Sequence, residues 1–213
     1  MARAFPVEDV RHISWTRLPD DREETARRFA FPFENAGCMR NGTIFTAAIR
    51  ERVEPMKPLG SILEQNVDES RYIPAEKLER WKYQKGAKRI RRTSSGGYAY
   101  TFSEGAVAFP NPLDKPGRTM LTSEASLNRS SHVVADPGTG RLRVLTPVEA
   151  ERMQGFDDGW TDTGMPNRMR YFCMGNALVV PMITRMGRIL DVIYSEESSV
   201  ESGNNQAQNQ TAA

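Results

Sequence analysis

No apolar run in this 213-residue sequence reaches the roughly 20 residues that a membrane-spanning helix needs. The opening MARAFPVEDVRHISW also lacks the charged start and apolar stretch of a secretory signal peptide. Only two cysteines are present, Cys38 and Cys173, and neither has a second Cys or His at the spacing of metal ligands. We therefore expect a reduced, cytoplasmic protein with no membrane segment and no metal site.

The chain has no overall excess of charge, since its formal net charge is only +2. Basic residues are nevertheless concentrated between residues 77 and 92, where Glu79 is the one acid and Trp81 and Tyr83 are interleaved. A solvated charged helix is the common interpretation of such a run, and a strip that contacts phosphates is the alternative. The basic residues are Lys77, Arg80, Lys82, Lys85, Lys88, Arg89, Arg91 and Arg92.

The hydrophobic content of 38% suffices for one ordinary domain or two small lobes, and the sequence has no internal repeat. The first 50 residues predict extended chain with a hairpin turn at Asn41-Gly42. The segments PLGSILEQNV (58–67) and PAEKLERWKYQKG (74–86) each begin at a proline and predict helices. From residue 94 to residue 145 the composition favours short strands and long loops, with DPGTG (136–140) as a turn between strands.

Two helix starts are predicted near the C-terminus. Thr146 is placed as an N-cap, with Pro147 and Glu149 completing a capping box and Gly155 ending the helix. Asn176 is the predicted N-cap of a second helix. That helix has a wide apolar face, and either this chain or another surface must cover it. The face comprises Leu178, Val179, Met182, Ile183, Met186, Ile189, Leu190 and Ile193.

The segments RLRVLTPVEAERMQGFDDGW (141–160) and RMRYFCMGNALVVPMITRMGRIL (168–190) resemble the closing part of the bacterial cytosine-5 DNA methyltransferases. The first is similar to their ninth conserved motif, and Gly175-Asn176-Ala177 is similar to their tenth. DKPGRTMLTSEASLNRSSHVV (114–134) is similar to the variable target-recognition region that precedes the ninth motif. The resemblance runs from about residue 4 to residue 194.

The resemblance implies an α+β fold in four parts. Residues 1–55 would be a connecting segment after a missing catalytic half, and residues 56–143 an irregular, β-rich target-recognition region with helical pieces. Residues 144–194 would carry the helices of the ninth and tenth motifs. The C-terminal helix would pack on the doubly wound methyltransferase domain of a partner chain. Residues 195–213, which offer little to bury, predict a disordered tail.

Several catalytic features of that family have no counterpart here. The family's nucleophilic cysteine follows a proline, whereas Cys38 follows Gly37 and Cys173 follows Phe172. Glu34-Asn35 is followed by Ala36 in place of the family's Glu-Asn-Val, and the sequence has no glycine-rich cofactor loop and no Gln-Arg-Arg-Arg motif. The chain therefore resembles the C-terminal half of an enzyme, beginning just after the catalytic half would end.

Two functions are compatible with this resemblance. The chain is either the small subunit of a split DNA (cytosine-5-)-methyltransferase, or a non-catalytic DNA-binding module or truncated remnant of such a gene. In the first case a large catalytic subunit would carry the cysteine and most of the S-adenosylmethionine site. The complex would methylate cytosine in a specific sequence of double-stranded DNA, as in bacterial restriction-modification.

The resemblance also implies site residues. Gly175, Asn176 and Ala177 would complete the cofactor site, where a glycine permits close approach of the backbone and a helix N-terminus suits a carboxylate. Loops of the target-recognition region, around two expected short strands, would contact DNA. Those residues are Arg118, Thr119, Ser123, Arg129, Ser130 and Ser131. We expect His132 to pack locally, and Trp81 and Trp160 to be anchors of the core.

Overall fold

A computed structural model describes residues 7–51 and 55–211 of the chain. The fold divides into an N-terminal unit, Met1–Pro55, and a C-terminal unit, Met56–Ala213. The connecting segment predicted over residues 1–55 lies outside the described residues at 1–6 and 52–54, and the predicted tail lies outside them at 212–213.

The N-terminal unit is a three-stranded antiparallel sheet with the strand order β1-β3-β2. The strands β1 (Val7–Arg17), β2 (Ala36–Arg40) and β3 (Thr43–Glu51) are accompanied by one short helix, α1 (Arg22–Arg28). The hairpin predicted at Asn41-Gly42 is confirmed, because both residues have the positive φ, 49° and 74°, that a tight two-residue hairpin turn requires.

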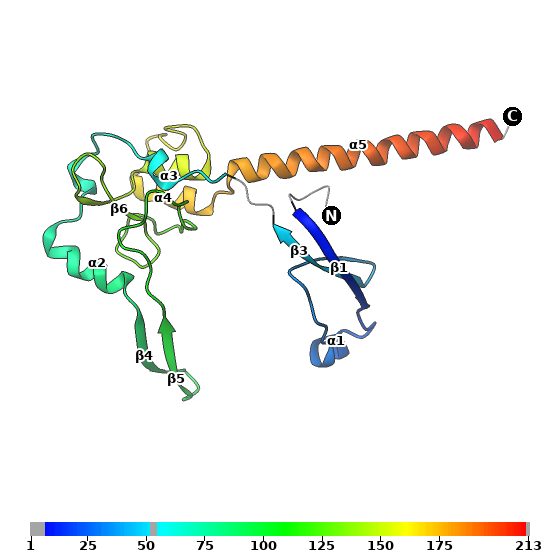
Figure 1. Ribbon diagram of the computed structural model, residues 1–213, viewed down its shortest axis with the longest axis horizontal. Coiled ribbons are helices and arrows are strands. Elements are labelled where there is room, and N and C mark those ends of the chain that lie inside the picture. The colour runs from blue at the N-terminus through cyan, green and yellow to red at the C-terminus, as the bar shows by residue number, and fades with distance from the viewer. Residues whose placement is uncertain (1–6, 52–54, 212–213) are drawn as a thin grey trace. The chain divides into compact units, whose positions relative to one another are not determined.

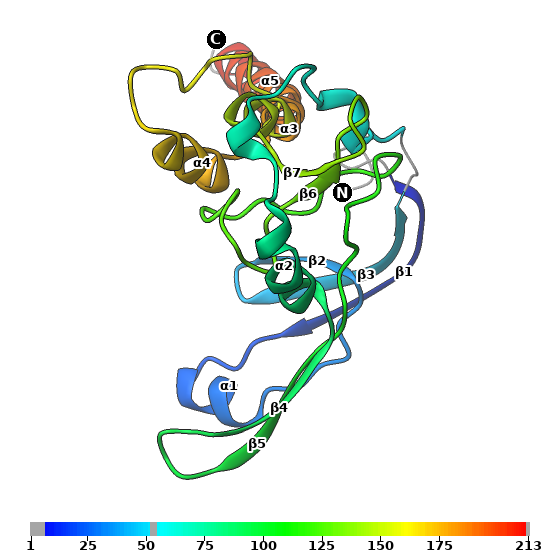
Figure 2. The same ribbon diagram turned by 90° about the vertical axis from the view of Figure 1, so that its left-hand side faces the viewer.

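The C-terminal unit combines short helices with two separate two-stranded sheets, and α5 extends from it as one long helix (Figures 1 and 2). This arrangement agrees with the expected α+β class. The elements are α2 (Leu78–Lys85), β4 (Lys88–Thr93), β5 (Ala99–Glu104), β6 (Val133–Ala135), β7 (Leu142–Val144), α3 (Pro147–Gln154), α4 (Asn167–Asn176) and α5 (Val180–Thr211).

The core of this unit is built around β6, whose side chains are buried on both faces. Val133 packs with Trp81 and Val144 in one cluster, and Val134 packs with Leu59 in another. Successive residues of a strand point to opposite faces, so two adjacent valines hold two clusters together. The prediction that Trp81 anchors the core is confirmed.

An ion cluster lies beside this core and centres on Arg143 of β7, whose side chain is fully buried. Its Nε atom donates to Asp136 Oδ2 at 2.8 Å, and its two terminal nitrogens donate to the Glu149 carboxylate at 2.7 and 2.8 Å. Glu149 also accepts the backbone N–H groups of Thr146 and Glu64 at 2.8 Å each. Arg143 lowers the pKa of the Asp136 carboxyl by this hydrogen bond.

Two local predictions are confirmed beside this cluster. Thr146 and Glu149 form both hydrogen bonds of a capping box, and α3 ends at Gly155 in the left-handed conformation with φ 85°. The turn at 136–140 connects β6 to β7, and Asp136 Oδ1 accepts the backbone N–H groups of Gly138 and Thr139.

The helix predicted over 58–67 is wrong, because only a single 3₁₀ turn, Leu59–Ile62, forms there. The backbone N–H groups of Leu59 and Gly60 donate to the carbonyls of Lys115 and Leu113, at 2.8 Å each. These hydrogen bonds to a distant loop replace the local ones that an α-helix would need. The helix predicted over 74–86 does form, as a 3₁₀ turn followed by α2.

Two further expectations differ from the structure. Trp160 is 61% exposed, because Gly159 and Thr161 on either side donate their backbone N–H groups to Glu151 and turn the indole outward. The segment expected to be a disordered tail continues α5 as helix to Thr211. Extending an existing helix costs far less free energy than starting one.

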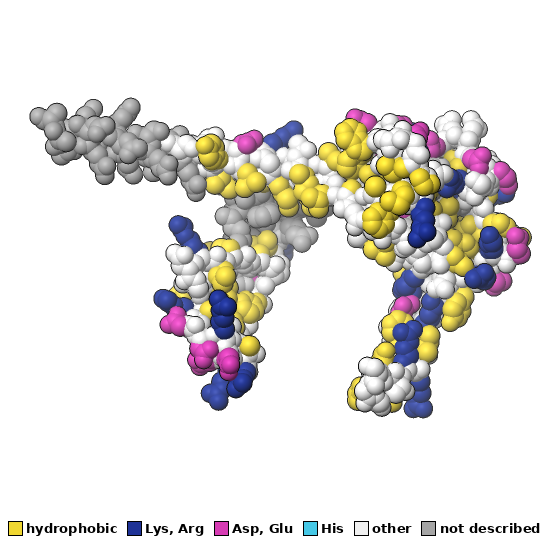
Figure 3. Space-filling model, turned by 180° about the vertical axis from the view of Figure 1, so that it is seen from behind, with side chains coloured by type: hydrophobic (Ala, Val, Ile, Leu, Met, Phe, Trp, Pro, Cys, Tyr) yellow, Lys and Arg dark blue, Asp and Glu magenta, His cyan; other side chains and the backbone are white. Residues whose placement is uncertain are grey.

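The apolar face predicted on the last helix is exposed on α5. Figure 3 shows hydrophobic side chains along the part of α5 next to the lobe, which is the remainder of the C-terminal unit. Met182, Met186 and Leu190 are among the exposed residues. Within the described ranges, no helix is both long enough and apolar enough to cross a membrane.

The stability of the C-terminal unit should depend on Arg143. The substitution Arg143→Met leaves two buried carboxylates without their counter-charge, so we expect the free energy of unfolding to fall by about 3–5 kcal/mol. Urea denaturation measures this change. The matched control is Arg141→Met, two residues away, because Arg141 pairs with Glu69 at the exposed surface. An equal loss of stability in both variants would contradict the importance of burial.

Candidate nucleic-acid interface and cofactor motif

Residues 118–132 belong to one long loop between β5 and β6, and neither of the two short strands that we expected them to surround forms within it. The first of the short strands that follow, β6, begins only at Val133. The loop brings Arg118, Ser130 and Ser131 together, because Arg118 Nη2 donates to the carbonyls of Ser130 at 3.2 Å and Ser131 at 3.3 Å. Burial lowers the pKa of the Arg118 guanidinium.

A buried His132–Glu124 pair holds this loop from inside. The backbone N–H of Arg118 donates to His132 Nε2 at 3.0 Å, so this ring nitrogen acts as an acceptor. His132 Nδ1 then carries the hydrogen and donates to Glu124 Oε2 at 3.0 Å. Glu124 Oε1 accepts the backbone N–H of His132 at 2.7 Å. The prediction that His132 packs locally is confirmed.

Arg129 also makes internal contacts, and they join the loop to the ends of the β4–β5 hairpin. Its Nη1 atom lies 3.2 Å from Glu104 Oε2 and 3.4 Å from the Gly86 carbonyl oxygen, and its Nη2 atom donates to the Gly105 carbonyl. Gly86 precedes β4, whereas Glu104 and Gly105 end and follow β5. One guanidinium therefore clamps both ends of the hairpin.

Lys85 supports the junction between the loop and the hairpin from the interior of the unit. Its side chain is buried, and its ammonium group donates to the carbonyl oxygen of Arg129 at 2.9 Å and to that of Ser131. Burial lowers the pKa of Lys85 to about 8. The sequence placed Lys85 in a basic strip, but the structure divides that strip between α2 and β4 and turns Lys85 inward.

The hydroxyl residues of the loop fall into two groups. The Ser131 hydroxyl is occupied inside the loop, where it donates to the Ser126 carbonyl at 2.6 Å. Thr119 and Ser123 are exposed, and Ser130 is half-buried. The structure therefore leaves Thr119 and Ser123 with the greatest access to a ligand among the predicted DNA-contacting residues.

The Gly175-Asn176-Ala177 segment ends α4, so the prediction that Asn176 caps the following helix is wrong. Asn176 is the last residue of α4, its side-chain nitrogen donates to the Phe172 carbonyl at 3.1 Å, and α5 begins only at Val180. Pro181 lies in the first turn of α5, where its fixed φ favours a helix start. The anion-binding helix N-terminus expected at Asn176 is therefore absent.

Contacts from α3 fix α4 and thereby place this segment. Arg170 Nη2 lies 2.9 Å from Glu151 Oε1, and Gln154 Nε2 donates to the Met174 carbonyl at 2.8 Å. Tyr171 donates its hydroxyl hydrogen to the Leu145 carbonyl at 2.6 Å. Asn176 remains exposed at the end of the helix, and its Oδ1 atom accepts no hydrogen bond from the described residues.

The close approach that requires Gly175 is made within the chain. A Cβ atom at this position would lie 2.3 Å from the Thr122 backbone nitrogen and 2.5 Å from the Leu121 carbonyl carbon. Gly175 thus lets α4 contact the backbone of the 118–132 loop. This contact joins the proposed cofactor segment to the proposed DNA-contacting loop.

We expect Gly175→Ala to destabilise the C-terminal unit by about 1–3 kcal/mol, because backbone atoms of residues 121 and 122 must move. Gly187→Ala is the matched control: this glycine also lies in a helix, but a Cβ there meets nothing within 4 Å. It should cause no loss of stability, since alanine favours helix. Urea denaturation of both variants tests the expectation, and equal stability of Gly175→Ala and the wild type would contradict it.

A hairpin arm was the feature that the sequence interpretation missed. The strands β4 and β5 pair in register from Lys88↔Glu104 to Thr93↔Ala99 and project from the lobe (Figure 2). Part of the signal was present after Gly96-Gly97, where the aromatic residues Tyr98, Tyr100 and Phe102 occupy every second position. The excess of basic residues obscured it.

Comparisons with known proteins agree with the resemblance in the sequence. A family model described as C-5 cytosine-specific DNA methylase matches residues 8–191. The type II methyltransferase M.Sau3AI of Staphylococcus aureus is 45% identical over 197 residues, which are 91% of this chain and 47% of that protein. The chain thus spans about half the length of this relative.

Two solved structures are also similar. The methyltransferase EhMeth of Entamoeba histolytica gives a TM-score of 0.45 at 17% identity, over 70% of this chain and 46% of that one. The Dnmt2 methyltransferase of S. pombe gives a TM-score of 0.44 at 13% identity, over 71% of this chain and 53% of that one.

Proposed function

Because the chain belongs to the family of C-5 cytosine-specific DNA methylases, we propose that it supplies the DNA-recognising half of a DNA (cytosine-5-)-methyltransferase. In this proposal the enzyme transfers a methyl group from S-adenosylmethionine to cytosine in double-stranded DNA, within a restriction-modification system or a related one. The observation that carries the proposal is the 45% identity to a type II methyltransferase over 91% of this chain.

The nucleophile of the reaction would come from outside this sequence. Cys38 lies exposed on β2 after Gly37, and Cys173 is half-buried in α4 after Phe172. Neither cysteine has the preceding proline of the family's nucleophile. We propose that a complementary half, carried by a large catalytic subunit, provides this cysteine and most of the cofactor site.

Exposed apolar surfaces support docking to such a half. On α5 they include Met186 and Leu190. On the sheet of the N-terminal unit, Trp15 pairs with Phe45 across β1 and β3, and both rings are exposed, as is Ile13 two residues earlier on the same face. Large exposed apolar patches mark surfaces that another protein covers.

The DNA-contacting part would be the 118–132 loop. We propose that Thr119, Ser123 and Ser130 contact DNA from the loop surface, while the internal hydrogen bonds of Arg118, Arg129 and Ser131 hold its shape. Hydroxyl groups on loops commonly contact phosphate oxygens.

The first test is complementation. The purified chain alone should transfer no radiolabelled methyl group to DNA, and adding the N-terminal half of M.Sau3AI, which serves as a surrogate catalytic half, should restore transfer. The double variant Met186→Glu/Leu190→Glu should abolish this restoration, because it charges the apolar face of α5. Asp191→Lys changes the opposite face of the same helix and should leave restoration intact.

Methyl transfer by the chain alone would contradict the need for an external nucleophile. Failure of the pair to transfer methyl groups, with the two halves still associating, would instead favour a non-catalytic DNA-binding module.

The second test concerns the cofactor. We propose that Asn176, with Gly175 and Ala177, completes the S-adenosylmethionine site of the assembled enzyme through its Oδ1 atom, which accepts no hydrogen bond from the described residues. Asn176→Ala removes this acceptor, whereas Asn176→Asp keeps an oxygen acceptor but loses the amide donor to the Phe172 carbonyl that holds the side chain in place. Each change should raise the dissociation constant for the cofactor on the order of tenfold, or about 1.4 kcal/mol.

Calorimetric titration of S-adenosylmethionine into the complex measures this effect. Asn167→Ala is the matched control, because Asn167 is exposed at the other end of α4. Equal affinity in the wild type and both Asn176 variants would leave the segment with a purely structural role as a helix end.

A further inference from the structure

The hairpin formed by β4 and β5 has two chemically different faces. Side chains alternate between the faces along each strand, and residues paired across the strands share a face. One face therefore carries Ile90 paired with Phe102, and Arg92 paired with Tyr100. The other carries Arg89 paired with Ser103, and Arg91 paired with Thr101.

The first face is held together by its own contacts. Ile90 and Phe102 are half-buried, and the Arg92 guanidinium lies 4.1 Å above the Phe102 ring centroid. At the base, Lys88 Nζ lies 3.8 Å from Glu104 Oε2. These contacts give the hairpin a small apolar core and account for the interactions of Arg92 and Lys88.

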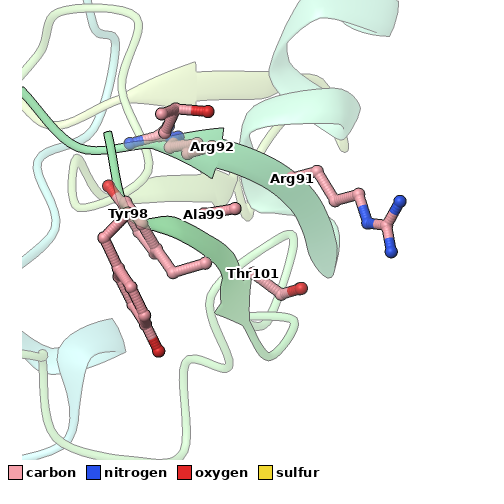
Figure 4. Close-up of a pocket in the computed structure, with 7 residues that line it drawn as sticks. Arg91, Arg92, Tyr98, Ala99 and Thr101 are labelled. Atoms are coloured by element: carbon pink, nitrogen blue, oxygen red, sulfur yellow. The ribbon is translucent and has the colours of Figure 1, made fainter.

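The second face has no such internal role. Arg89, Arg91, Thr93, Thr101 and Ser103 are all exposed. Within the described residues, the side chains of Arg89 and Arg91 form no ion pair or hydrogen bond. In Figure 4, Arg91 and Thr101 extend to the same side of the ribbon, whereas the Tyr98 ring extends to the other.

The charge of the hairpin is strongly one-sided. Between residues 88 and 104 there are four basic residues and one acidic residue. The acid, Glu104, is engaged by Arg129 and Lys88, so it does not offset the charges of Arg89 and Arg91. Figure 3 shows Lys and Arg side chains along the arm that projects from the lobe.

The hairpin is anchored at its base. Arg129 joins Gly86, Glu104 and Gly105, and the backbone N–H of Val107 donates to the Lys85 carbonyl at 2.9 Å. These contacts hold the base of the hairpin against the 118–132 loop. The fixed base limits the conformational entropy that the hairpin loses when it binds a ligand.

We propose that the face formed by Arg89, Arg91, Thr93, Thr101 and Ser103 is a phosphate-contacting surface for duplex DNA. The inference rests on the proposed DNA-recognising function and locates part of it on an arm outside the 118–132 loop. Exposed arginine guanidiniums flanked by hydroxyl groups match the donors that contact phosphate oxygens in protein–DNA complexes. Such contacts set affinity and orientation on the duplex without selecting a base sequence.

The test is the salt dependence of DNA binding by the full chain. Titration of a labelled 30-base-pair duplex at several salt concentrations gives the slope of log K against log salt. The slope is negative, and each lost phosphate contact makes it shallower by about 0.9. Arg89→Ala/Arg91→Ala should therefore make it shallower by about 1.8. The double variant should also weaken binding to several 30-base-pair duplexes of unrelated sequence by the same factor.

Two matched variants separate this effect from general charge and from folding. Lys77→Ala/Arg80→Ala removes the same charge from exposed positions just before and on α2, and it should leave the slope nearly unchanged. Arg89→Lys/Arg91→Lys keeps the point charges and should restore most of the slope. Circular dichroism melts check that every variant folds like the wild type.

An unchanged slope in Arg89→Ala/Arg91→Ala, or an equal reduction in the Lys77→Ala/Arg80→Ala control, would overturn the proposal. Loss of binding to one of the unrelated duplexes alone would also overturn it, because the arm would then contact bases. The complementation assay reports on the proposed function separately. A chain that binds duplex DNA through the arm but restores no methyl transfer retains the arm's role and loses the proposed enzymatic one.

Discussion

The buried guanidinium of Arg143 fixes the relation between β7, the turn after β6 and the start of α3. A buried charge is tolerated only when it is fully paired, and here all three nitrogens donate to the carboxylates of Asp136 and Glu149. Since Glu149 also belongs to the capping box, the helix can begin only where the ion cluster allows. The next turns of α3 then present Glu151 and Gln154 to α4.

The position of the 175–177 segment is therefore set from a distance. From Arg143 the connection passes through α3 to Arg170 and the Met174 carbonyl, and from there to the end of α4. The close contact of Gly175 with the backbone of residues 121 and 122 extends this connection into the 118–132 loop, for which we propose DNA contacts. Because the 175–177 segment and the 118–132 loop share backbone contact, a shift of one displaces the other, which would couple the proposed cofactor and DNA sites.

Sequence reasoning succeeded where neighbouring residues decide the conformation. The capping box at Thr146, the turn at 136–140 and the hairpin at Asn41-Gly42 each depend on side chains within four positions, and all three formed as predicted. It failed where a group had a distant alternative. The backbone N–H of Gly60 donates to the Leu113 carbonyl instead of joining a helix. Asn176 ends α4 instead of starting the next helix, because contacts with α3 hold residues 167–176 as a helix of their own.

The same distinction governs the arginines of the proposed recognition region. Residue type alone makes Arg118, Arg129, Arg89 and Arg91 equivalent, yet the carbonyl and carboxylate partners of the first two are far from them in sequence or belong to irregular loops. A guanidinium held by internal acceptors gains little from a phosphate, because it must first give up those bonds. An exposed one on an anchored arm gives up only water and counterions, and the release of counterions favours binding. The internal arginines therefore hold the shape of this surface, whereas the exposed ones are those that, in our proposal, contact phosphates.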